Sequence, residues 1–160
     1  MASANKTKIV AKSGRQDIII TREFDAPAEK VFHTHITPDL YSRWLAPRKF
    51  VINIQTFEPK AGGSWRYILK DMDGHEMGFH GVYHEVKTNE KIVCTFEFEG
   101  EHGYTVLSVT KFEQLPQNRS RLIIQSVFQT VEERDAEMKF LTEEELNDSF
   151  IRLEQLLPKA

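Results

Sequence analysis

Cysteine is almost absent from this sequence of 160 residues, in which Cys94 is the only one. A single cysteine excludes an internal disulfide and a zinc cluster built from several cysteines. No uninterrupted apolar run reaches the roughly 20 residues that a membrane-spanning helix needs. The first residues also lack the apolar segment of a secretory signal. We therefore expect a cytoplasmic protein with no membrane span and no cofactor.

Positive charge is not in excess either. The chain holds 21 Lys and Arg against 24 Asp and Glu, for a net charge of −3. Because nucleic-acid binding depends on a basic surface, we expect no nucleic-acid partner. No linker rich in Pro, Gly or Ser divides the chain, so the sequence predicts a single domain over 1–160. Residues 1–14 are predicted to form a loose N-terminal arm, in which 9–11 can add an edge strand.

The hydrophobic pattern changes twice along the chain. Residues 17–24 are rich in β-branched side chains and predict a first strand. Pro27 and Pro38 then favour the starts of two short helices in succession. From residue 50 the period is two, which predicts strands in succession. Turns are expected at 58–63, 71–74, 87–90, 100–103 and 114–118, between strands that extend to residue 129.

A long amphipathic helix is predicted over 142–157. Thr142 and Glu145 have the spacing of a capping box, and Pro158 marks the end. One face of this helix carries four apolar residues: Leu146, Phe150, Leu153 and Leu157. A second capping box, Thr130 with Glu133, predicts a short helix over 131–140 just before it. The long helix needs a sheet against which its apolar face can be buried.

These elements predict an α+β protein in which a curved antiparallel sheet packs against the C-terminal helix. Such a sheet can enclose a cavity between its inner face and the helix, as ligand-binding proteins do. A completely filled core is the simpler alternative. The sequence pattern leaves both open.

Several segments resemble, in order, the family homologous to the C-terminal domain of the activator of the 90-kDa heat-shock-protein ATPase. This family is part of the SRPBCC (START/Bet v 1-like) superfamily. The similar segments, which together cover roughly 7–157, are Thr21–Phe32, Thr37–Pro47, Pro59–Arg66, Asp73–Val86, Glu132–Ala136 and Arg152–Leu157. The resemblance implies a helix-grip fold: about seven antiparallel strands wrapped around a long C-terminal helix, with two short helices after the first strand.

The sequence departs from the family pattern in three places. Leu45 stands where a second Trp is common, Thr88 and Asn89 replace a usual Pro, and Thr142–Glu145 replaces Gly-Met or Gly-Trp. The last change lies at the start of the long helix and is expected to reshape one mouth of the cavity. The family has no shared catalytic motif, so no catalytic residue is carried over.

The spacing of histidine, cysteine, acidic and serine residues does not indicate a metal site or a catalytic site. The six histidines show no His-x-x-x-His on a helix and no Cys–His ligand pattern, so no metal site is predicted. The acidic residues of 71–76 are typical of a hairpin turn. Cys94 alternates with Ile92 and Phe96, which predicts a buried thiol and not a nucleophile. No Gly-x-Ser-x-Gly motif is present.

Aromatic residues are the stronger candidates for a binding site. Core packing accounts for most of them, but Tyr and Trp also offer polar groups that orient apolar ligands. We predict a cavity wall that includes Trp44, Trp65, Tyr67, His80, Tyr83, Phe96, Leu146, Phe150 and Leu153. In this set, Tyr67, His80 and Tyr83 are the expected polar groups.

Three functions remain open at this stage. The leading one is a protein that binds a small hydrophobic molecule between the sheet and the C-terminal helix. The second, which the resemblance implies, is a regulator of a chaperone ATPase with a role in the stress response and a chaperone as partner. The third is an enzyme that uses the cavity, like related cyclases and hydrolases. Both a monomer and a homodimer are compatible with the sequence.

Overall fold

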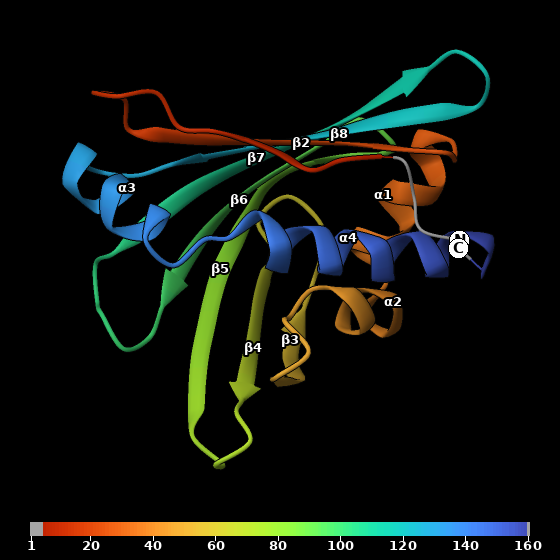
Figure 1. The fold of residues 1–160 in the computed structure, drawn as a ribbon. Coiled ribbons are helices and arrows are strands. Elements are labelled where there is room, and N and C mark those ends of the chain that lie inside the picture. The colour runs from red at the N-terminus through yellow and green to blue at the C-terminus, as the bar shows by residue number, and fades with distance from the viewer. Residues whose placement is uncertain (1–4, 160) are drawn as a thin grey trace.

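The computed structural model describes residues 5–159 and contains one antiparallel sheet with four α-helices (Figure 1). The N-terminal part comprises β1 (Lys8–Val10), β2 (Asp17–Phe24), α1 (Ala28–Ile36) and α2 (Pro38–Trp44). The middle comprises β3 (Val51–Phe57), β4 (Ser64–Lys70), β5 (Glu76–Lys87), β6 (Lys91–Phe98), β7 (Thr105–Leu115) and β8 (Arg119–Val127). The C-terminal part comprises α3 (Val131–Met138), α4 (Glu143–Leu156) and a 3₁₀ turn at Leu157–Lys159.

The sheet has eight strands in the order β1-β2-β8-β7-β6-β5-β4-β3, with all neighbours antiparallel. The strands from β3 to β8 form a meander, and β2 joins it beside β8. The helix-grip architecture expected from the sequence is confirmed, with one strand more than expected. The additional strand is β1, which lies inside the segment predicted to be a loose arm. It pairs with β2. Residues 1–4 of that arm lie outside the described part.

The helices begin where the sequence predicts them. The hydroxyls of Thr130 and Thr142 accept hydrogen bonds from the backbone N–H groups of Glu133 and Glu145, at 3.1 and 3.2 Å. Each threonine thus satisfies one of the free N–H groups at a helix start. In the described part of the chain, the Glu145 carboxylate forms no hydrogen bond with the Thr142 N–H, which would be the second half of the capping box; it pairs with Lys49 at 3.3 Å.

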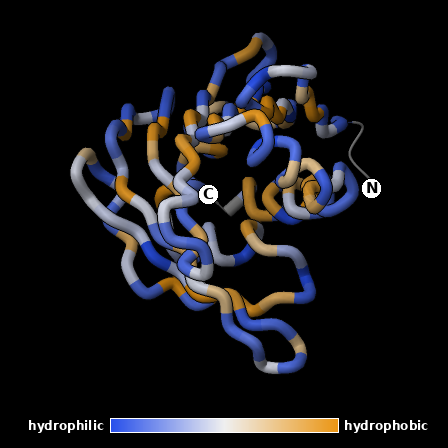
Figure 2. Tube along the Cα trace, turned by 90° about the vertical axis from the view of Figure 1, so that its left-hand side faces the viewer, coloured by the Kyte–Doolittle hydropathy of each residue, from blue (hydrophilic) through white to orange (hydrophobic). Residues whose placement is uncertain are grey.

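The core lies between the inner face of the sheet and the helices. Buried and less buried positions alternate along strands such as β2 and β4, so that one face of the sheet is apolar. Figure 2 shows hydrophobic and hydrophilic positions interspersed along the chain. The apolar stripe of α4 contributes Phe150 and Leu153, which are 2% and 0% exposed. The sheet curves around α4, as Figure 1 shows.

An ion pair that the sequence pattern does not reveal links α4 to the sheet. The Arg22 guanidinium on β2 is completely buried and donates to the Glu154 carboxylate at 2.8 Å. It also lies over the Phe24 ring, 4.9 Å from the ring centroid. The ion pair holds the Glu154 side chain, which is 20% exposed, against the sheet. An unpaired buried arginine would be costly.

Among residues 5–159, no helix has both the length and the apolar composition needed to cross a membrane.

Candidate functional site

Five aromatic side chains form a continuous surface on the inner face of β4, β5 and β6. We call this set the aromatic face; it consists of Trp65, Tyr67, Phe79, Phe96 and Phe98. Neighbouring rings are 5.2 to 5.6 Å apart between centroids. The three phenylalanines are only half-buried, whereas Trp65 and Tyr67 are buried. Half-buried aromatic rings in contact are typical of a surface that receives an apolar partner.

The aromatic face is assembled by strand register. Tyr67 pairs with Phe79, and Phe79 pairs with Phe98 across the next ladder. Directly opposed residues of antiparallel strands point to the same side of the sheet, which places their rings side by side. Trp65 lies opposite Gly81, where an added Cβ would come 2.6 Å from its indole Nε1. Glycine at this position therefore lets the indole lie over β5.

Polar groups are placed beside this surface. Tyr67, Tyr83 and Cys94 lie on the inner face of the sheet, and Tyr41 reaches them from α2 through Phe57. Within residues 5–159, none of the three tyrosine hydroxyls forms a hydrogen bond, and the Trp65 Nε1–H is buried without a partner. Buried polar groups usually have a hydrogen-bond partner. The tyrosine hydroxyls are therefore the donors left for a bound molecule, whereas the indole N–H lies against β5 at Gly81.

Burial keeps these groups uncharged. It raises the pKa of Tyr41, Tyr67 and Tyr83 above the ordinary phenol value, and it raises the pKa of the Cys94 thiol to about 11. Loss of hydration disfavours the phenolate and thiolate forms. At neutral pH the inner face therefore presents neutral hydroxyl and thiol groups. It can orient a ligand by hydrogen bonds, and among these four groups there is no base or activated nucleophile.

The structure brings four of the nine predicted wall residues together on the inner face of β4 to β6. These are Trp65, Tyr67, Tyr83 and Phe96. Two residues that sequence reasoning left out of the site, Phe79 and Phe98, complete the surface. The alternation of β5 and β6 contained the signal, because Phe79 lies two positions before Gly81 and Phe98 lies two positions after Phe96.

Three other predicted residues are packed core. The Trp44 ring stacks on the Phe150 ring with centroids 6.2 Å apart, and its Nε1–H donates to the Thr34 carbonyl at 3.1 Å. Leu153 is fully buried in the same region. Because its ring is packed and its N–H group is hydrogen-bonded, Trp44 fills the contact between α2 and α4. Leu146, one turn earlier on α4, is half-buried against the core.

His80 requires a correction, because it lies on the outer face of the sheet. It pairs with Arg66, one position away from the Tyr67–Phe79 pair, so its side chain points away from the aromatic face. Its Nε2 lies 2.8 Å from Glu97, and its Nδ1 lies 2.9 Å from Glu99. Side-chain alternation, once the register is fixed, separates His80 from Tyr67 and Tyr83.

The outer face holds the strongest ion pair of this region. Arg66 donates two hydrogen bonds of 2.8 Å to the Glu99 carboxylate. Together with the His80 contact, this pair lowers the pKa of Glu99 to about 2. Gly78 makes room for it, because a Cβ there would overlap the Glu99 carboxylate. The perturbed carboxylate is thus a structural partner on the opposite side of the sheet from the aromatic face.

One group of potential metal ligands occurs among the described residues, at the turn between β4 and β5. It consists of Asp71, Asp73 and His75. The Asp71 carboxylate already accepts hydrogen bonds from the backbone N–H groups of the other two, at 2.9 and 2.8 Å. This is the Asp–Gly turn chemistry expected from the sequence.

An antiparallel sheet curved around a C-terminal helix, with two short helices inserted after its second strand, defines the class of helix-grip proteins. The model of one family of this class, described as Activator of Hsp90 ATPase homolog 1-like protein, matches residues 25–158. The chain belongs to this family.

Solved structures share the fold at low sequence identity. A crystal structure from Rhodobacter sphaeroides has a TM-score of 0.87 at 20% identity, covering 97% of this chain and 99% of that chain. A solution structure from Arthrobacter aurescens has a TM-score of 0.81 at 23% identity, covering 96% of this chain and 92% of that one. A crystal structure from Mycobacterium smegmatis has a TM-score of 0.83 at 15% identity, covering 95% and 96%. No curated protein matches the chain.

Proposed function

We propose that this protein binds a small hydrophobic molecule against the aromatic face, between the sheet and α4. The observation that carries the proposal is the row of contacting aromatic rings, three of them half-buried, on the side of the sheet that curves around the helix. Ligand sites of soluble proteins are mostly apolar with a few placed polar groups. The free hydroxyls of Tyr67 and Tyr83 supply such groups.

The chemistry of the inner face favours an uncharged ligand region. The phenols of Tyr67 and Tyr83 and the thiol of Cys94 are kept neutral by burial. They can donate hydrogen bonds to a ligand but cannot neutralise a charge on it. A charged group placed among these rings would lose its hydration without gaining a counter-ion. We infer that the part of the ligand in contact with the aromatic face is apolar, with an oxygen acceptor for a tyrosine hydroxyl.

A glutamate in place of Phe98 is expected to weaken binding of a neutral fluorescent probe, N-phenyl-1-naphthylamine, at least about tenfold. The carboxylate would have to be desolvated against the probe. The matched control is Val82→Glu, because Val82 is 39% exposed on the outer face of the same sheet. This control should bind within about twofold of the unmodified protein. Fluorescence titration measures both, and circular dichroism verifies the fold.

Two results would contradict this proposal. One is no increase in probe fluorescence with the unmodified protein. The other is an equal loss of probe affinity in Phe98→Glu and Val82→Glu. That result would mean that the probe does not bind specifically at the aromatic face.

Regulation of a chaperone ATPase is the second candidate function, and the family description favours it. The shared fold by itself does not select this function, since unrelated functions occur on one fold. Adding the protein to a purified Hsp90-type chaperone and measuring ATP hydrolysis separates the two. A rise in ATPase rate supports regulation, and no change together with no complex on size exclusion removes it.

A further inference from the structure

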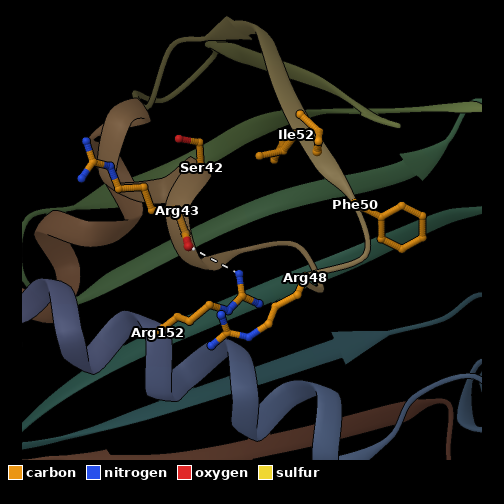
Figure 3. Close-up of a pocket in the computed structure, with 7 residues that line it drawn as sticks. Ser42, Arg43, Arg48, Phe50, Ile52 and Arg152 are labelled. Atoms are coloured by element: carbon orange, nitrogen blue, oxygen red, sulfur yellow. Dashed lines mark hydrogen bonds between the residues drawn. The ribbon is translucent and has the colours of Figure 1, made fainter. Parts of the chain in front are cut away.

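An open pocket of about 500 Å³ lies between α2, β3 and α4. We call it the arginine pocket; its lining residues are Ser42, Arg43, Arg48, Phe50, Val51, Ile52 and Arg152. Three of these seven residues are arginines and none is acidic, in a chain whose net charge is −3. The side chains come from α2, the loop after it and β3, which follow one another in sequence, and from α4, which lies about 100 positions later (Figure 3). A local excess of positive charge beside apolar side chains points to an anionic ligand with an apolar part.

Arg152 is the fixed charge of the pocket. Its side chain is only 14% exposed. Its Nη2 donates to the Ala46 carbonyl at 2.6 Å and to the Ser149 hydroxyl at 3.1 Å, and its Nη1 donates to the Arg43 carbonyl at 3.4 Å. These bonds hold the guanidinium in one orientation at the base of α2. These acceptors are neutral, so the Asp148 carboxylate, 3.2 Å from the Arg152 Nε, is the one negative group that faces this guanidinium among the contacts of the described residues.

Arg48 lies beside Arg152 and has free donors (Figure 3). Its Nε donates to the Asp148 carboxylate oxygens at 3.0 and 3.1 Å, and the Arg152 Nε lies 3.2 Å from the same carboxylate. Two guanidinium groups thus share one carboxylate, which leaves one positive charge. In the described part of the chain, the two terminal nitrogens of Arg48 form no hydrogen bond. Their parallel N–H groups match the two oxygens of a carboxylate.

The other side of the pocket is apolar. Ile52 points from β3 toward α2, and Phe50 lies further along the same segment (Figure 3). Arg43 points away from Arg48 and Arg152, and pairs with Asp39 at 3.2 Å. The anion-binding end is therefore made by Arg48 and Arg152, and Ile52 lies across from it, whereas the Phe50 ring points away from the arginines (Figure 3).

We propose that the arginine pocket binds an organic monocarboxylate with an apolar tail, held at its carboxylate by Arg48 and Arg152. The single excess positive charge complements a monoanion, and the fork of free N–H groups on Arg48 complements a planar carboxylate. The tail lies along Ile52, which points from β3 toward α2. This site is separate from the neutral aromatic face, so its ligand does not depend on the function proposed above.

Octanoate is the probe for this site, and titration followed by two-dimensional NMR and by calorimetry measures its binding. We expect shifts confined to the lining residues, no comparable binding of the neutral 1-octanol, and weaker binding of inorganic phosphate. Replacing Arg48 with glutamine should weaken octanoate binding about tenfold, because a charge-assisted hydrogen bond is lost. The side chain of Arg48 is 64% exposed, so its exchange leaves the packing unchanged.

Arg43→Gln is the matched control. It removes an arginine that lines the same pocket but points outward, so octanoate affinity should change less than about twofold. An equal loss in both variants would indicate a general charge effect and would overturn the proposal. Equal affinity for 1-octanol, equal affinity for phosphate, or no octanoate binding would also overturn it. The neutral naphthylamine probe tests the aromatic face separately, so failure at one site is distinguishable from failure at the other.

Discussion

Replacing Phe150 with alanine is expected to lower the free energy of unfolding by about 4 kcal/mol. The side chain is 2% exposed and lies where α4 meets both α2 and the sheet. Its ring contacts Phe24 edge-on, with centroids 6.0 Å apart, and stacks on Trp44 at 6.2 Å. Truncation removes the transfer energy of the ring and leaves a cavity among neighbours that cannot collapse into it. Urea denaturation followed by circular dichroism measures the loss.

Leu146→Ala provides the control on the same stripe of α4. Leu146 is half-buried in the first half of the helix, so its loss should cost only about 1–2 kcal/mol. Similar losses for the two variants would mean that α4 is not held mainly through its central aromatic contact. Because a domain of this size has a total stability of about 5–15 kcal/mol, both variants should remain folded at low temperature.

Acidification from pH 6.5 to pH 4 is expected to lower the stability by about 3 kcal/mol through His35 alone. Burial lowers the pKa of His35 from its ordinary value of 6.5 to about 4. Its Nδ1 contacts the Val31 carbonyl at 2.9 Å, and its Nε2 is buried without a partner. A proton added at Nε2 would therefore have neither an acceptor nor water, between the rings of Trp44 and Phe112.

The sign of this effect follows from the order of protonation. Between pH 6.5 and 4 the unfolded chain carries a proton on His35 and the folded protein does not, so stability falls as the pH falls. The carboxylates with lowered pKa act mainly below this window: Glu99 titrates at about 2, and Asp17, held by hydrogen bonds from Arg15 and Gln125, titrates lower still. Between pH 4.5 and 6.5 the slope therefore reports on His35 rather than on these acids.

His35→Phe is the variant that isolates this contribution. The phenyl ring has a similar shape and no titratable group, so the variant should lose less stability between pH 6.5 and 4.5 than the unmodified protein does. Glu137, whose pKa burial raises, contributes equally to both proteins. Denaturant unfolding at several pH values measures the slope for both proteins, and the remaining five histidines are common to them. The same slope in both proteins would show that His35 does not cause the loss, whatever the absolute stability of the variant.

The fold could be predicted from the sequence to a large extent because it is encoded locally. The change of hydrophobic period from two to 3.6, the threonine caps at residues 130 and 142, and the Asp–Gly turn each act within a few residues. The additional strand β1 was only an open possibility in the sequence. Its three residues become a strand by pairing with β2, which is a tertiary contact.

The candidate site was predicted less completely because side-chain direction depends on register. Tyr67 and Tyr83 do share the inner face, but His80 lies on the other side, and a register shift between Tyr83 and Glu85 interrupts the ladder with β6. A strand pattern read from one chain does not show which face is the inner one where both faces carry aromatic or polar residues. The half-buried state of Phe79 and Phe98 likewise depends on how far the helices cover the sheet.

The sequence by itself determined the order of the elements, the apolar stripe of α4 and the absence of a disulfide, because these depend on neighbouring residues and composition. Only the tertiary structure decided which side chains distant in sequence come into contact. It buried Arg22 against Glu154, and it joined Arg48 to Asp148, 100 positions away, beside Arg152. The physical reason is that the curvature of the sheet and the packing of α4 bring distant charges together, and no local pattern records such a distance.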